Sequence, residues 1–155
     1  MTKNFRRLAT LAAIPLLLAG CAQKVDFETF KEKATAAIEA RDENKEIAYF
    51  KVKGTWDDDS VNFSTETAKD MTLTEIAIAT VLLTEIDISI YTGTEKNGVT
   101  YSVGGGFVIS YKTTDDEGDE YSWKRTYNTQ GYLTNYAGVQ DEDKTNVTIT
   151  YVYEK

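Results

Sequence analysis

Hydrophobic and polar residues follow two different periods along this chain, and the change between them predicts its architecture. Apolar residues recur at steps of three and four over residues 26–41, which is the spacing of one face of an α-helix. From residue 86 onward they recur at every second position, as in half-buried β-strands. Helices followed by a run of strands indicate an α+β fold, with one or two helices in the N-terminal half packed on a curved antiparallel β-meander.

The first predicted helix covers residues 26–41. Asp26 can accept hydrogen bonds from the free backbone amides at the helix start, and Glu28 places negative charge at the positive end of the helix dipole. We expect the apolar face of this helix to pack on the sheet rather than to bind a partner. That face consists of Phe27, Phe30, Ala34, Ala37 and Ile38.

Residues 72–84 are compatible with two structures. Thr72 and Glu75 have the spacing of a capping box, and the run that follows is apolar on nearly every side, which favours a buried helix. The same run is rich in β-branched residues, which also suit a strand. The sequence leaves both interpretations open.

The remaining segments predict strands, about six to eight in all. Residues 46–56 and 61–63 flank the turn Asp57–Asp59 and form a first hairpin. An Asn97-Gly98 hairpin signal punctuates the later strands. Gly104–Gly106 predicts either a tight hairpin turn or a kink that curves the sheet. The alternating apolar positions of the meander are Ile86, Ile88 and Ile90; Val99, Tyr101 and Val103; Phe107, Ile109 and Tyr111; Tyr121, Trp123 and Tyr127; Tyr132 and Tyr136; and Val147, Ile149, Tyr151 and Tyr153.

The first 21 residues have the three-part layout of a secretory signal. A basic start precedes an apolar run over residues 8–18. Because Thr10 and Pro15 interrupt this run, it suits neither a membrane span nor a core helix. A site of small residues follows and ends in the only cysteine of the chain. The basic residues are Lys3, Arg6 and Arg7, and the site is Leu18, Ala19, Gly20 and Cys21.

This site resembles the lipobox of bacterial lipoproteins. The resemblance implies that a signal peptidase recognises Leu18, Ala19 and Gly20, and that Cys21 becomes the N-terminus and carries a diacylglyceryl group with fatty acids such as palmitate. Two or more acyl chains hold a protein stably at a membrane. We therefore expect an exported protein anchored to the cell membrane or the outer membrane by its lipid. Residues 1–20 are the cleaved signal peptide, 21–25 a lipidated tether and 26–155 a single globular domain; an uncleaved, unlipidated signal is the alternative.

Composition excludes several kinds of chemistry. The chain has no histidine and one cysteine, so Ser-His-Asp and Cys-His catalysis, Cys/His zinc sites and an internal disulfide are ruled out. From Cys21 onward the net charge is −11, because the first 20 residues hold three basic and no acidic side chains. We expect such a surface to repel nucleic acids and anionic lipid headgroups, since both bind basic patches.

Acidic turns are the remaining candidates for metal binding or catalysis. Aligning Gly118 with the sixth position of a calcium loop places Thr113 first and Lys124 twelfth, and neither suits the role. We interpret the turns at residues 57–59, 115–120 and 141–143 as solvated hairpin tips. Glu85 and Asp87 are expected to point outward from the sheet. The sequence thus predicts no enzyme, no metal, and no cofactor beyond the covalent lipid.

Aromatic residues supply the only candidate ligand groove. Tyr101, Tyr111, Trp123 and Tyr136 are predicted to point inward, where they suit either a core beneath the helices or a wet-rimmed groove. We expect a non-catalytic binding or interaction module of the cell envelope, with an envelope protein as its partner and no nucleic acid.

The alternative function is a carrier or chaperone of a small hydrophobic ligand such as a lipid, held between helices and sheet. The order of elements is similar to that of periplasmic lipoprotein carriers and localisation factors. A carrier should have more inward apolar side chains than its helices can cover. An interaction module should instead expose a discrete apolar patch.

Overall fold

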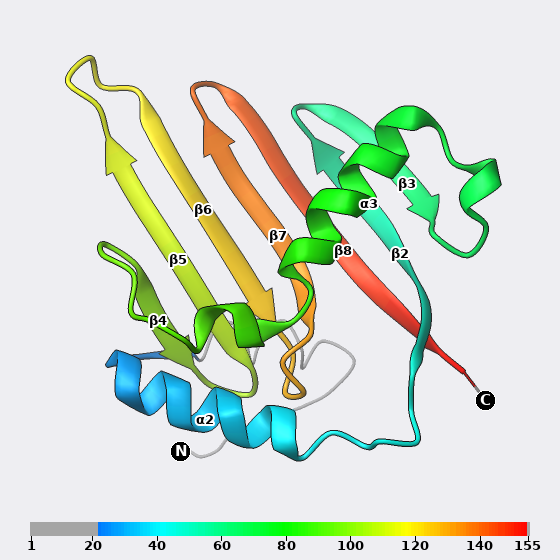
Figure 1. Ribbon diagram of the computed structural model, residues 1–155. Helices are drawn as coiled ribbons and strands as arrows, with labels where there is room; N and C mark the ends of the chain where they lie inside the picture. The colour runs from blue at the N-terminus through cyan, green and yellow to red at the C-terminus, as the bar shows by residue number, and fades with distance from the viewer. Residues whose placement is uncertain (1–21, 155) are drawn as a thin grey trace, which may run out of the picture.

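The computed structural model describes residues 22–154, which form one eight-stranded antiparallel sheet with two α-helices on one of its faces (Figure 1). This confirms the predicted α+β class and the antiparallel meander. The helices are α2 (Phe27–Glu39) and α3 (Leu73–Glu85). The strands are β1 (Gln23–Val25), β2 (Ile47–Trp56), β3 (Asp59–Ser64), β4 (Thr100–Val103), β5 (Phe107–Thr114), β6 (Glu120–Tyr127), β7 (Leu133–Gln140) and β8 (Asp143–Tyr153).

The sheet is a central meander extended at both edges. Strands β4 to β8 lie side by side in chain order, the β2–β3 hairpin pairs with β8, and β1 pairs with β4. Three hairpin turns, β2–β3, β5–β6 and β7–β8, lie at the same end of the sheet (Figure 1). The β4–β5 and β6–β7 turns lie at the opposite end.

Helix α2 begins and packs as its sequence predicts. The Asp26 carboxylate accepts a hydrogen bond from the Thr29 amide at 2.7 Å, which caps the helix. Phe27, Phe30 and Ala34 are buried. The Phe30 ring lies 4.8 Å from that of Tyr101, so α2 is packed against the β4 side of the sheet by aromatic contacts.

Residues 72–84, for which two structures were compatible with the sequence, lie in helix α3 and its cap. Both hydrogen bonds of the capping box are present: the Glu75 amide donates to the Thr72 hydroxyl at 3.1 Å, and the Thr72 amide donates to the Glu75 carboxylate at 3.0 Å. The helix buries Ile78, Ala79 and Leu82 in the common core. Local capping therefore outweighs the β-branched content of this segment.

The expected strand at residues 86–90 is wrong. Ile88–Tyr91 form a short 3₁₀ helix, η3. The Asp87 carboxylate accepts a hydrogen bond from the Ser89 amide at 2.9 Å and starts this turn. Ile88 is fully buried whereas Ile90 is 46% exposed, so these residues do not share one strand face. The Asn97-Gly98 turn consequently connects η3 to β4 and is not a hairpin.

Within the expected tether, Gln23–Val25 form strand β1. Lys24 pairs with Ser102 and Val25 with Tyr101 of β4. The sheet thus begins two residues after Cys21.

The turn at Gly104–Gly106 is confirmed. The Gly104 amide donates to the Gly106 carbonyl at 2.9 Å between β4 and β5. A Cβ atom at Gly106 would lie 2.2 Å from the Tyr127 carbonyl oxygen, so the neighbouring backbone requires glycine here.

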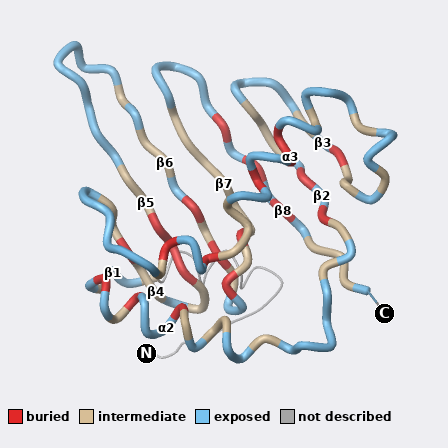
Figure 2. The backbone as a smooth tube through the Cα atoms, in the orientation of Figure 1, coloured by how far each residue is buried: buried red, intermediate tan, exposed pale blue. Residues whose placement is uncertain are grey.

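The described residues share one hydrophobic core. Buried strand segments lie beneath the helices, and the hairpin turns at the far end are exposed (Figure 2). The buried residues of this core cluster run from Phe27 to Ile149, and both helices contribute to it. Helices and sheet therefore pack as one unit.

Candidate functional site

The sheet has two chemically different faces, set by the alternation of side chains along its strands. The helix-side face holds the buried apolar residues, for example Val52, Ile109 and Val147. The opposite face, which we call the outer face, is not covered by either α-helix (Figure 1).

The helix-side face contains a buried ion pair between Arg125 and Glu85. The Arg125 Nε of β6 lies 3.0 Å from the Glu85 Oε1 at the end of α3, with the side chains only 9% and 17% exposed. The Arg125 Nη1 also donates to the Ala137 carbonyl of β7 at 2.9 Å. Glu85 was expected to point outward, and this expectation is wrong: α3 ends over the sheet and directs the carboxylate inward.

Tyrosine hydroxyls complete the hydrogen bonding of Glu85. Tyr91 donates to both carboxylate oxygens at 3.1 and 3.2 Å, and Tyr127 donates to the Glu85 backbone carbonyl at 2.8 Å. Burial, reinforced by the Glu85 charge, raises the pKa of Tyr91. Burial and then the neighbouring Tyr91 raise the pKa of Tyr127. Both hydroxyls therefore stay protonated and act as donors.

Aromatic rings cover the guanidinium. The Arg125 Cζ lies 3.5 Å from the ring centroid of Tyr136 and 5.2 Å from that of Trp123. Trp56 stacks on Tyr136 with ring centroids 5.2 Å apart. Contacts with ring faces suit the delocalised charge of a guanidinium. Together with the hydrogen bonds above, they make Arg125 the centre of a network that links α3, η3, β2, β6 and β7. Its polar groups are partnered within the fold.

The four residues of the candidate groove lie on this face, but only Tyr111 and Trp123 border a common hollow. Tyr101 is buried beneath α2, with Phe27 5.3 Å away. Tyr111 and Trp123 stack at 6.0 Å, and Tyr136 lies between Arg125 and Trp56. The aromatic residues therefore act mainly as core and as the cover of the ion pair.

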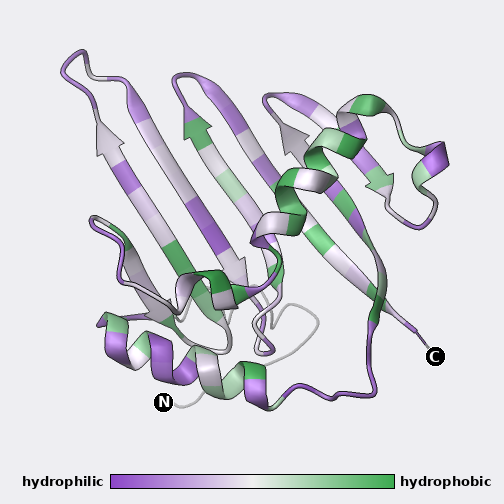
Figure 3. Cartoon of the chain, in the orientation of Figure 1, coloured by the Kyte–Doolittle hydropathy of each residue, from purple (hydrophilic) through white to green (hydrophobic). Residues whose placement is uncertain are grey.

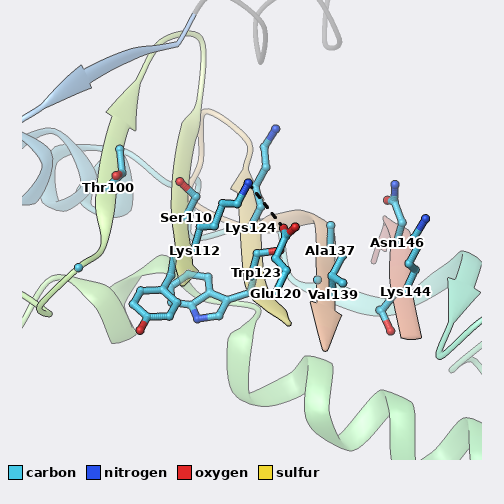
Figure 4. Close-up of a pocket in the computed structure, with 15 residues that line it drawn as sticks. Thr100, Ser110, Lys112, Glu120, Trp123, Lys124, Ala137, Val139, Lys144 and Asn146 are labelled. Carbon is cyan, nitrogen blue, oxygen red and sulfur yellow. Dashed lines mark ion pairs between the residues drawn. The ribbon is translucent and has the colours of Figure 1, made fainter. Parts of the chain in front are cut away.

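The outer face is rich in lysine, although the chain is acidic. Figure 4 shows Lys112, Lys124 and Lys144 projecting from β5, β6 and β8 on the side of the sheet away from the helix drawn below it. The strand register places every lysine of the eight strands on this face. These six exposed lysines are Lys24, Lys51, Lys53, Lys112, Lys124 and Lys144.

Carboxylates are scarce on the same face. Within the strands it carries one acidic residue, Glu120, whose Oε2 lies 3.9 Å from the Lys112 Nζ. Among residues 22–154, the other five lysines of the face have no carboxylate within 4.0 Å. The outer face is therefore cationic, although the net charge of the chain is negative.

A shallow hollow of about 550 Å³ lies on the outer face between β4 and β8. Lysines line it together with small polar side chains, among them Ser110, Ser122 and Asn146 (Figure 4). A neighbouring hollow of about 410 Å³ includes Lys51, Lys53 and Thr148. The two hollows extend the cationic surface across most of the sheet.

The acidic residues gather instead at the three hairpin tips. Residues 57–59, 115–120 and 141–143 place eleven carboxylates at one end of the sheet, which is the hydrophilic end in Figure 3. Burial and then the Asp58 carboxyl raise the pKa of Asp143. Across the described part of the chain, no group of three or more acidic, cysteine or histidine side chains has a geometry suited to a metal ion.

Helix α3 presents an apolar surface to solvent. Leu73 is 86% exposed and Leu83 61%, and Ile76 and Val81 are also exposed (Figure 3). The only charged residues of this helix are Glu75, which belongs to the capping box, and Glu85, which pairs with Arg125. Apart from Glu75 at its N-terminus, the exposed surface of α3 therefore carries no charged side chain.

The residues of the predicted lipidation site, Leu18 to Cys21, lie outside the described residues. The next residue, Ala22, lies beside the β4–β5 turn, where a Cβ at Gly104 would meet its Cα at 2.9 Å. An apolar hollow of about 290 Å³ opens there, lined in part by Ala22, Val108 and Thr134. Ala22 is thus at the end of the sheet opposite the acidic hairpin tips.

No family model, curated protein or solved structure matches this chain. In residues 22–154, neither helix has the length and apolar character needed to cross a bilayer. The function is therefore argued from the sequence and the geometry alone.

Proposed function

We propose that this protein is an exported bacterial lipoprotein, held at the cell membrane or the outer membrane by a lipid on Cys21, whose domain is a non-catalytic binding module of the cell envelope. The anchor follows from the signal layout and the Leu18-Ala19-Gly20-Cys21 site. Because β1 begins two residues after Cys21, the domain would stand close to the membrane. Its acidic hairpin tips would point away from the anchored end.

The observation that carries the binding role is the exposed apolar surface of α3. Leu73, Ile76 and Leu83 project from a helix whose opposite side is already packed on the sheet. An exposed apolar surface on an otherwise acidic protein is typical of a protein interaction site. We propose that an envelope protein binds there.

The carrier alternative has less support. A lipid groove between helices and sheet needs space there, but Ile78 and Leu82 of α3 pack into one core with Val147 and Ile149. The apolar hollow beside Ala22 has about 290 Å³, slightly below the range of about 300–1,000 Å³ usual for ligand pockets. We therefore favour the binding module.

We infer a non-catalytic role because the buried polar groups already bind partners within the fold. Glu85 and Arg125 bind each other, tyrosine hydroxyls and backbone carbonyls. A catalytic acid or base must instead face a substrate.

Fractionation of cells expressing the full chain tests the anchor. We expect the wild-type protein in the membrane fraction and Cys21→Ser in the soluble fraction, because the variant lacks the sulfur that accepts the lipid. Gln23→Ser, an exposed change two residues away, is the matched control and should remain with the membranes. Retention of Cys21→Ser in washed membranes would contradict the proposal.

A further inference from the structure

We propose that the outer face of the sheet binds an acidic polysaccharide, a sugar chain that bears carboxylate groups. This site is separate from the apolar surface of α3 and does not depend on the lipid anchor. Its basis is the separation of charge on the sheet: six lysines and one acid, Glu120, on the outer face of the strands, and ten further acids at the hairpin tips. Such a field attracts anions to the face and orients them along it.

The lysines are spaced to meet a chain of charges rather than one ion. Lys112 and Lys124 lie on adjacent strands, and Lys144 lies two strands beyond Lys124. Neighbouring strands are about 4.8 Å apart, so these three lysines span roughly 15 Å across the sheet. The register places Lys112 and Lys144 on one row across the sheet, with Lys124 two residues away along its strand. Lys53 on β2 is opposite Thr148 and lies farther along the strands. A polymer lying across the strands would pass the first three.

The side chains between the lysines favour a sugar. Ser110, Ser122 and Asn146 line the larger hollow, and Thr148 the smaller one. Hydroxyl and amide groups both donate and accept hydrogen bonds, as sugar hydroxyls do. Lysine supplies point charges for carboxylates. The outer face therefore offers both kinds of contact that an acidic sugar chain requires.

Two other anionic partners fit less well. Single-stranded nucleic acid binds through aromatic side chains on which bases stack. Tyr111 and Trp123 do border the larger hollow, but their rings stack on each other, with centroids 6.0 Å apart, and Tyr136 does not line it. A planar anionic membrane lying on the outer face would approach all three hairpin tips and their eleven carboxylates. A narrow chain would approach them only beside Lys112 and Lys144, which lie next to the tips.

Binding of the purified full chain, kept in detergent, to polygalacturonate tests the proposal, with neutral dextran as the ligand control. The test variant is Lys112→Gln/Lys124→Gln/Lys144→Gln. The matched control is Lys31→Gln/Lys33→Gln/Lys69→Gln, which removes the same charge from exposed positions outside the sheet. Urea unfolding of each variant confirms that it is folded, and Lys51→Gln/Lys53→Gln serves as a second test variant.

We expect wild type to bind polygalacturonate and not dextran, with affinity that falls as salt rises. Since an exposed ion pair changes affinity by about two- to five-fold, the outer-face triple variant should bind about tenfold more weakly or worse. The control triple should stay within about twofold of wild type. Absence of wild-type binding, equal losses in both triples, or tighter binding to anionic phospholipid vesicles or single-stranded DNA would overturn the proposal.

Discussion

Replacing Arg125 with methionine should destabilise the domain more than any other single charge removal in the described residues. The substitution keeps the length of the aliphatic stem but leaves the Glu85 carboxylate buried without its cation. The guanidinium also bonds the Ala137 carbonyl at 2.9 Å and lies 3.5 Å from the Tyr136 ring centroid. All three interactions are lost together.

The expected magnitude follows from the burial of the pair. Removing one partner of a buried ion pair costs about 3–5 kcal/mol, because the remaining charge is desolvated and unpaired. Glu85 is 17% exposed and keeps the Tyr91 hydroxyl, so we expect the lower end, about 3 kcal/mol. With an unfolding entropy of about 2.1 cal/mol/K per residue, this corresponds to a fall in Tm of about 10 °C.

Urea unfolding followed by the fluorescence of Trp56 and Trp123 measures the loss. Lys124→Met is the matched control: it removes the neighbouring charge from the exposed outer face and should change stability by less than about 0.5 kcal/mol. The double variant Glu85→Gln/Arg125→Met should be at least about 1 kcal/mol more stable than additivity predicts. If the losses of unfolding free energy in the double variant were additive, the coupling between Glu85 and Arg125 would be refuted. A loss for Arg125→Met no larger than that for Lys124→Met would refute it too.

Two further predictions concern the packing of α2 and a surface ion pair. Phe30→Ala should cost about 3–5 kcal/mol in the same assay, because the ring is fully buried between Tyr101 and Phe107; a loss below about 1 kcal/mol would show that α2 is not part of the core. Burial opposes ionisation of Asp87, but hydrogen bonds from Arg41 and Ser89 together with the Arg41 charge outweigh it and lower the pKa of Asp87. Ionised Asp87 therefore stabilises the folded protein above pH about 4, and this stabilisation is lost as pH falls through the lowered pKa. Wild type should be more stable than Asp87→Asn at about pH 6, and the two should approach the same stability at about pH 2. A stability difference that does not change with pH would contradict this assignment.

The sequence was sufficient for those elements whose signals are local. Asp26 and Thr72 mark the two helix starts, and the period-two pattern locates most of the strands. The segment at Ile88–Tyr91 has the same alternation, but its structure depends on the Asp87 side chain and on burial of Ile88 alone. The spacing of apolar residues therefore does not predict a turn that a polar side chain starts.

The buried network depends on contacts that are distant in the sequence. Glu85 and Arg125 are separated by 40 residues, and each looks like an exposed charge by itself. A local signal for Arg125 did exist, because it occupies the inward phase between Trp123 and Tyr127. Its partner could not be chosen among 25 acidic residues without the fold.

The cationic face was visible in the sequence but hidden by the net charge. Lys51 and Lys53 flank the inward Val52, and Lys112, Lys124 and Lys144 likewise fall on the polar phase of their strands. Assigning a charge to each strand face, rather than to the whole chain, would have predicted the patch.

The mass of the N-terminal peptide of the protein extracted from membranes tests the central claim most directly. The lipoprotein proposal predicts a chain that begins at Cys21 and carries the added mass of a diacylglyceryl thioether, with or without a third acyl chain. A chain that still begins at Met1, or one that begins at an unmodified Cys21, would contradict the anchor on which the proposed envelope function rests.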